Sequence, residues 1–195
     1  MPRFSENERK LIHDKLLVEG ERLFTAHGIK KVTIDELVDV VGIAKATFYT
    51  FFESKEYLYL DIVQSIQKKV FDELSAVLDS NVYLPAKKRV RQVFDVMLEM
   101  LFKYPILSQI DTATTKLIYR KVTKKRLMAF DTQNIDAVHA MHTHGINFSC
   151  NIEVASYAFQ SIYQSWMYMQ DKDEMIQTSV TDILLNGVID QIVSD

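Results

Sequence analysis

Three histidines and the only cysteine of the chain lie close together in its C-terminal half: His139, His142, His144 and Cys150. His139 and His142 are three residues apart, so they share one face if this stretch is helical, and that spacing suits two zinc ligands. The alternative is a polar helix end before Gly145, where histidines complement the helix dipole. We predict no metal site and no cofactor, and the zinc alternative stays open.

The short signatures of catalysis are missing. The sequence contains no G-x-S-x-G, H-E-x-x-H, P-loop or G-x-G-x-x-G motif. It also has no Glu-x-x-His pair, which a di-iron carboxylate bundle requires. A lone thiol such as Cys150 is more often inert than reactive. We therefore predict that the protein is not an enzyme.

The composition favours long helices. The 195 residues are 48% hydrophobic and 25% charged, with only five glycines and three prolines. These are globular values, and so few breakers disfavour a turn-rich β-sandwich. Apolar residues recur at helical spacing almost everywhere. We expect an all-α fold of about nine helices.

Capping signals mark the first helices. Ser5 with Glu8, and Thr33 with Glu36, have the spacing of capping boxes. Gly28 is a typical C-terminal stop of the first helix. A third short helix is expected from Ala44 to Phe51. Later helices are expected over 54–80, 86–103, the residues after Pro105, 115–142 with a possible break, 151–170 and 173–193.

The three short helices suggest a helix-turn-helix, with Gly42 in the tight turn between the second and third. Such a turn needs apolar residues on both sides, so that the two helices pack at a steep angle. All five positions expected to be buried are apolar: Leu37, Val41, Ile43, Phe48 and Phe51.

The stretch from Thr33 to Leu58 resembles the N-terminal domain of TetR/AcrR-type transcriptional regulators. The resemblance rests on an ordered pattern that includes Leu23-Phe24, Gly28, Thr33, Gly42, Tyr49, Phe52, Lys55 and Leu58. It covers about residues 8–60, and the rest is similar only in length and helical character. It implies a homodimer that binds a palindromic operator and leaves it when a small ligand enters the C-terminal domain. Ala44 and Ala46 depart from the serine and glycine common in the family.

The resemblance also implies which residues touch DNA. Thr33, Tyr49 and Lys55 would contact phosphates, and a hydroxyl, a phenol and an ammonium can all donate to phosphate. Thr50 is a further candidate for a phosphate or base contact.

Base contacts would come from the N-terminal part of the third helix, which enters the major groove. Lys45, Ala46 and Thr47 lie there. Lys45 could reach guanine O6 and N7, and the Thr47 methyl group could meet a thymine methyl.

The charge balance does not by itself indicate a DNA-binding protein. Residues 1–58 contain nine Lys/Arg and ten Asp/Glu, so their net charge is −1, and the whole chain carries −3. A positive face must therefore arise by segregation of charge. The basic cluster over 116–126 is expected to be a solvated face. A helical ligand-binding or interaction protein without DNA binding remains the alternative function.

The last two expected helices carry wide apolar stripes, which predict pairing with their copies as a four-helix interface. The predicted interface residues are Phe159, Ile162, Trp166, Ile176, Val180, Ile183, Leu184, Gly187 and Val188. A palindrome needs two recognition helices about 34 Å apart, which a dimer supplies.

Met and aromatic residues between 94 and 163 could line a pocket for an apolar or aromatic effector. The predicted ligand-binding residues are Phe94, Met97, Leu101, Tyr119, Phe130 and Tyr163. The alternative for each of them is a place in an ordinary helical core.

The expected organisation is a helix-turn-helix domain over 1–53 and a ligand-binding and dimerisation domain over 54–195, linked by the helix 54–80. No apolar run approaches the length of a membrane span, and no signal peptide is apparent, so we expect a cytoplasmic protein without membrane partners. Together these features predict a ligand-responsive transcriptional regulator, and we expect a repressor.

Overall fold

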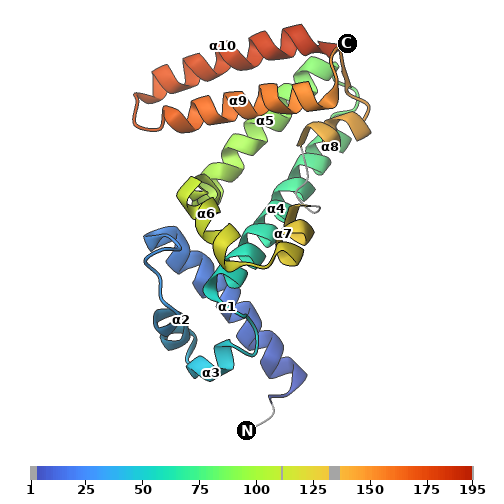
Figure 1. The fold of residues 1–195 in the computed structure, drawn as a ribbon. Helices are drawn as coiled ribbons and strands as arrows, with labels where there is room; N and C mark the ends of the chain where they lie inside the picture. Colours follow the sequence, from blue (N-terminus) through green and yellow to red (C-terminus); the bar gives the residue numbers. More distant parts are fainter. Residues whose placement is uncertain (1–3, 111, 132–136, 195) are drawn as a thin grey trace. The chain divides into compact units, whose positions relative to one another are not determined.

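The computed structural model describes residues 4–110, 112–131 and 137–194 (Figure 1). In these residues the chain forms ten α-helices, one 3-10 helix and one two-stranded ladder. The prediction of an all-α fold is confirmed. Contacts divide the chain into a first unit, residues 1–67 with 104–134, and a second unit, residues 68–103 with 135–195. The predicted boundary at residue 53 stays a prediction.

The first unit begins with α1 (Glu6–His27), α2 (Ile34–Val41) and α3 (Lys45–Phe48). Both predicted capping boxes are present. The Ser5 hydroxyl accepts a hydrogen bond from the Glu8 backbone at 3.3 Å, and the Thr33 hydroxyl accepts one from the Glu36 backbone at 3.2 Å. These contacts fix where α1 and α2 begin, because they satisfy backbone donors that have no partner within the helix.

Gly42 forms the turn of the predicted helix-turn-helix. Its φ of 78° lies in the left-handed region, which costs glycine nothing and other residues strain. Its backbone donates to the Val38 carbonyl at 2.8 Å and thereby closes α2. α3 is shorter than the expected 44–51: it ends at Phe48, and residues 49–51 form a turn.

The core of this unit joins α1, α2 and α3 to the start of α4 (Lys55–Ser80). Phe24, Leu37, Phe48 and Leu58 are fully buried. Gly20 lets α1 and α4 approach closely, since a Cβ at this position would lie 2.9 Å from Cδ1 of Ile62.

Three later elements belong to the same unit: the 3-10 helix η1 (Pro105–Gln109), α6 (Thr112–Lys121) and α7 (Lys124–Asp131). Gln109 donates to the Thr25 carbonyl of α1 at 2.7 Å. Arg126 of α7 forms an ion pair with Asp61 of α4 and a 3.0 Å hydrogen bond to Gln64. The N-terminal helices are therefore braced by a segment distant in sequence.

The stretch over 115–142, expected to be helical with a possible break, contains more than one helix. α6 ends at Lys121, α7 begins at Lys124, and α8 spans Ala137–Thr143. The break between α6 and α7 has a physical cause. Thr123 accepts a 3.4 Å hydrogen bond from the Arg126 backbone, and its own backbone N–H donates to the Tyr57 hydroxyl at 3.2 Å. Thr123 thus begins a new helix with a partner on α4.

The second unit contains the end of α4 with α5 (Ala86–Lys103), α8, α9 (Ile152–Tyr168) and α10 (Glu174–Ile192). Asn151 and Asp173 cap α9 and α10, each accepting a backbone hydrogen bond. A short antiparallel ladder pairs β1 (Asn147–Phe148) with β2 (Val193–Ser194). The core gathers apolar residues of all five helices, among them Leu78, Val90, Met141, Phe159 and Leu185.

Among the described residues, none of the helices combines the length and the hydrophobicity that crossing a membrane would require.

Candidate nucleic-acid interface

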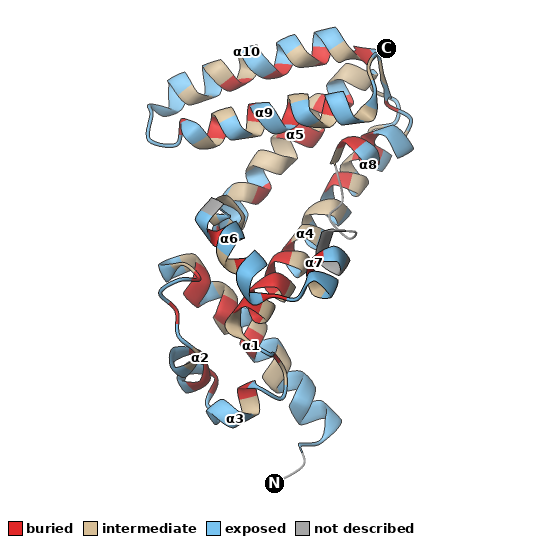
Figure 2. Ribbon diagram, viewed as in Figure 1, coloured by how far each residue is buried: buried red, intermediate tan, exposed pale blue. Residues whose placement is uncertain are grey.

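The short helix α3 exposes the side chains that the sequence predicted to meet DNA. Lys45, Ala46 and Thr50 are exposed, Thr47 is half-buried, and Tyr49 is 52% exposed. Phe48 faces the other way and is fully buried. A four-residue helix thus has one face anchored in the core and the opposite face open to a partner, as Figure 2 shows for α3.

Lys45 is exposed to solvent, and it also has an ion-pair partner within the protein. Its Nζ lies 2.9 Å from a carboxylate oxygen of Asp35 in the first turn of α2. The hydrogen bond to Asp35 raises the pKa of Lys45, and nearby Tyr49 adds to the effect. Lys45 is therefore fully charged at neutral pH, and an acidic partner neutralises it.

Lys55 stands at the start of α4 and is held by the segment that leads into α2. Its Nζ donates to the Val32 carbonyl at 2.5 Å and to the Lys30 carbonyl at 3.5 Å. Both contacts use neutral acceptors, so the charge of Lys55 remains available to an anion.

Thr33 caps α2 and is exposed. Its hydroxyl also donates to the Glu36 carboxylate at 2.8 Å, and its backbone N–H donates to the same carboxylate at 2.6 Å. The Thr33 hydroxyl has a structural partner, and a phosphate would compete with it.

Four of the predicted DNA contacts line one hollow on the surface: Thr33, Lys45, Tyr49 and Lys55. Asp35 and Lys121 line the same hollow, and sequence reasoning named neither as a site residue. Lys121 comes from α6, 66 residues after Lys55, so no local motif could have revealed it. The polar lining of the hollow comprises the hydroxyls of Thr33 and Ser54, the Tyr49 phenol, three ammonium groups, and the carboxylates of Asp35 and Glu56.

Aromatic contacts with α1 fix the turn that follows α3. The Arg9 guanidinium lies 4.9 Å from the centre of the Phe51 ring, a cation–π distance. The His13 ring stacks on Phe52 with ring centres 5.4 Å apart. The turn carrying Tyr49 and Thr50 is therefore held between α1 and the core.

The six predicted ligand-binding residues are spread over the two units. Phe94 is buried in the core of the second unit, Met97 packs against that core, and Leu101 is half-buried. Tyr163 is half-buried, and its burial raises the pKa of the phenol. Tyr119 lies on α6 of the first unit and is 60% exposed. The side chain of Phe130 lies outside the described residues.

The nine predicted interface residues divide into two groups. Phe159, Ile162 and Trp166 of α9 are buried within the unit, where Trp166 meets Phe102 edge-on at 5.6 Å. The second group lies on α10: Ile176, Ile183, Leu184 and Gly187 are exposed, and Val180 and Val188 are half-buried. Figure 2 shows the row of exposed residues along α10.

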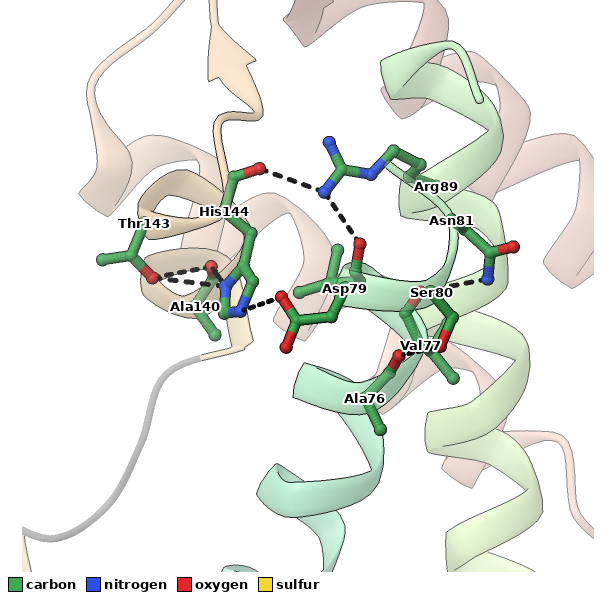
Figure 3. Close-up of polar contacts among 10 residues, drawn as sticks. Ala76, Val77, Asp79, Ser80, Asn81, Arg89, Ala140, Thr143 and His144 are labelled. Carbon is green, nitrogen blue, oxygen red and sulfur yellow. Dashed lines mark hydrogen bonds and ion pairs between the residues drawn. The ribbon is translucent and has the colours of Figure 1, made fainter. Parts of the chain in front are cut away.

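Two of the three histidines have backbone partners. The Nδ1 atoms of His142 and His144 lie 3.3 Å and 2.7 Å from the carbonyls of Ile146 and Ala140. Nε2 of His144 lies 3.5 Å from Asp79 (Figure 3). Within the described part of the chain, no three His, Cys, Asp or Glu residues are grouped as metal ligands.

A buried arginine that sequence reasoning missed lies beside this cluster. One terminal nitrogen of Arg89, Nη2, donates to the Leu78 and His144 carbonyls at 3.1 and 3.0 Å (Figure 3). Arg89 is 7% exposed, and its Nε has no hydrogen-bond partner in the described residues. The cation lies at the C-terminal ends of α4 and α8, where it complements the negative ends of both helix dipoles.

Known proteins resemble the chain in sequence. The family model described as "Bacterial regulatory proteins, tetR family" matches residues 16–62, most of which lie within the region of the predicted resemblance. An uncharacterized HTH-type transcriptional regulator of Bacillus subtilis (strain 168), YhgD, is 21% identical over 166 residues, which are 81% of this chain and 84% of the relative.

Solved structures share the fold over nearly the whole chain. The fatty acid degradation regulator FadR from Bacillus halodurans aligns with a TM-score of 0.60 at 13% identity, covering 96% of this chain and 97% of its own. The ketosteroid transcriptional regulator KstR2 of Mycobacterium tuberculosis aligns with a TM-score of 0.59 at 15% identity, covering 94% and 95%. A TetR-family regulator from Thermus thermophilus, PfmR, gives 0.57 at 18% identity, covering 94% and 97%.

Proposed function

We propose that the protein is a ligand-responsive repressor of the TetR type, since the tetR-family model matches its residues 16–62 and an HTH-type regulator of Bacillus subtilis is 21% identical to it. It binds a palindromic operator as a homodimer in the cytoplasm, and a small molecule releases it. Regulators of this family bind DNA and are not enzymes, so the prediction that the protein is not an enzyme is confirmed.

The observation that carries the proposal is the hollow lined by Thr33, Lys45, Tyr49 and Lys55. Hydroxyl and ammonium donors that converge on one space suit a phosphate oxygen. The exposed start of α3 beside them presents Lys45, Ala46 and Thr47 for the major groove. Thr50 donates to the Thr47 carbonyl at 2.7 Å, which leaves its hydroxyl oxygen able to accept a hydrogen bond.

Dimerisation is supported by the unpartnered face of α10. Ile176 is 56% exposed and Ile183 is 71% exposed. Large apolar side chains that lie open along one helix are typical of an association surface. Val154 and Tyr157 of α9 are exposed as well. We propose that α9 and α10 of two copies pack together and thereby present two recognition helices to successive turns of the duplex.

The effector that we propose is apolar or aromatic. Phe94, Met97 and Leu101 of α5 supply apolar surface in the second unit, with Tyr163 of α9 as a hydroxyl-bearing member. Two structural neighbours are described as fatty acid and ketosteroid regulators, and both names denote largely apolar molecules. The effector must bind the form that cannot bind DNA more tightly than the form that can, because only this difference releases the operator.

Selection of genomic fragments by the purified protein tests the function. We expect a small set of fragments that share an inverted repeat, with affinity that falls as salt rises. Lys45→Ala and Tyr49→Phe should weaken binding to the selected fragment, and added apolar small molecules should release it. If the protein selects no fragment at low salt, the alternative of a helical ligand-binding protein without DNA binding holds instead.

A further inference from the structure

The basic stretch on α6 and α7 contains no acidic residue. Residues 112–126 carry six cations: Lys116, Arg120, Lys121, Lys124, Lys125 and Arg126. Arg126 is paired with Asp61 of α4. The other five are exposed, and none of them has an ion-pair partner among the described residues. A solvated helix face usually mixes both signs of charge, so this one-signed surface suits an anionic partner.

The N-terminal region that contains the helix-turn-helix has no excess of positive charge. Residues 1–58 have a net charge of −1. Neutralisation of phosphates by Lys and Arg supplies the sequence-independent part of DNA affinity. The stretch over 112–126 belongs to the same unit as α1, α2 and α3, so its cations add positive charge to that unit.

Two contacts place this stretch beside the hollow. The Tyr57 hydroxyl donates to the Thr123 hydroxyl at 3.2 Å and accepts from the Thr123 backbone at the same distance. Tyr57 is two residues after Lys55, and Thr123 is two residues after Lys121. The pairing therefore brings Lys121 to the hollow that Lys55, Tyr49 and Thr33 line. One turn further along α4, the Arg126–Asp61 pair holds α7 in place.

We propose that Lys121, together with Lys124 and Lys125 at the start of α7, forms part of the operator-binding surface and contacts DNA phosphates. We name these three residues the α6–α7 corner. Lys121 meets the phosphate held at the hollow, and Lys124 and Lys125 attract the backbone beyond it. The corner adds affinity and no base preference, because ammonium groups that meet phosphates carry no sequence information. This inference rests on the proposed operator binding.

The test measures operator affinity by fluorescence anisotropy between about 50 and 200 mM salt. The probe is a duplex selected by the wild-type protein, and the variants are Lys121→Ala and Lys124→Ala/Lys125→Ala. Each lost phosphate contact should make the negative slope of log K against log salt shallower by about 0.9, and the losses of affinity at low salt in the two variants should together amount to a factor on the order of ten. The preferred bases should not change.

Lys88→Ala is the matched control, because Lys88 is an exposed lysine of the second unit. Lys121→Arg keeps the charge and should keep the affinity. If the corner variants bind the probe with the same slope and affinity as Lys88→Ala, the corner does not touch DNA. If the wild-type protein selects no duplex, the proposed function fails and this inference falls with it. Thermal melting of each variant separates lost binding from lost folding.

Discussion

The Lys45 ammonium lies 2.9 Å from the Asp35 carboxylate, so the first residue of the recognition helix is bound to the first turn of α2. The two residues are ten positions apart and join the two helices of the helix-turn-helix. Both side chains are more than half exposed, so water and salt weaken the pair. DNA has to replace Asp35 as the partner of Lys45, and the carboxylate repels the phosphates that approach it.

Asp35→Asn should therefore bind the operator more tightly. The change removes one negative charge from the hollow and leaves Lys45 without its competing partner, which we expect to raise affinity about three- to tenfold at low salt. Asp39→Asn removes the same charge from another exposed position of α2 and serves as the control. Weaker binding by Asp35→Asn would mean that the ion pair orients Lys45 for DNA and does not compete with it.

The two capping boxes should make stability depend on acid pH. Hydrogen bonds from the backbone N–H and hydroxyl of Ser5 lower the pKa of Glu8, and those of Thr33 lower the pKa of Glu36. A carboxylate whose pKa is lower in the folded state stabilises the fold above its unfolded pKa of about 4.3. That contribution disappears as pH falls through the lowered folded pKa.

Glu8→Gln/Glu36→Gln should therefore be less stable than the wild type at pH 7 and closer to it at pH 3. Urea unfolding at a series of pH values measures the difference. Glu53→Gln changes an exposed carboxylate outside both boxes and is the control. A stability difference that is constant from pH 7 to pH 3 would refute the assignment.

Arg89→Met should destabilise the second unit strongly. The change leaves the carbonyls of Leu78 and His144 without their donor in a buried place, for which we expect a loss of about 3 kcal/mol in the free energy of unfolding. Chemical denaturation measures it, with Lys88→Met as an exposed neighbour for comparison. Equal stability of the two variants would show that Arg89 does not hold α4 to α8.

Ile183→Glu should convert the proposed dimer to a monomer. A charge on the exposed face of α10 would have to be buried in the interface, at a cost that association does not recover. Sedimentation velocity should show a dimer for the wild type and a monomer for the variant, and affinity for the palindrome should fall with it. Val82→Glu places the same charge at a residue that is 64% exposed outside both helices and should remain dimeric. A dimeric Ile183→Glu protein would move the interface elsewhere.

Local signals in the sequence were enough to place the first three helices. Ser5, Thr33 and Gly42 act through hydrogen bonds and backbone angles within a few residues, and the structure has each of them in the expected role. The position of the break at Thr123, within a stretch where a break was expected to be possible, could not be predicted in the same way. Its backbone partner is the hydroxyl of Tyr57, 66 residues earlier, and only the folded chain brings the two together.

For the candidate site too, some features could be predicted from the sequence and others are seen only in the folded chain. Lys45 and Tyr49 are exposed, as the DNA contacts predicted for them require, and those contacts were predicted from the family resemblance and from the place of Lys45 at the start of the third helix. Phe159, Ile162 and Trp166 illustrate the opposite case. Their spacing indicates a buried face of α9, but periodicity does not say whether the chain itself or a second copy covers that face. In this structure the chain's own core covers it.

The first unit is assembled from two separate stretches of the gene product, because α1 packs against η1 and α4 is tied to the residues around Thr123. A protein engineer who wishes to transplant this DNA-binding module onto another receptor would have to move residues 104–134 along with residues 1–67. A conventional N-terminal fusion that ends at residue 67 would lack η1, which packs against α1, and the transplanted module would be incomplete.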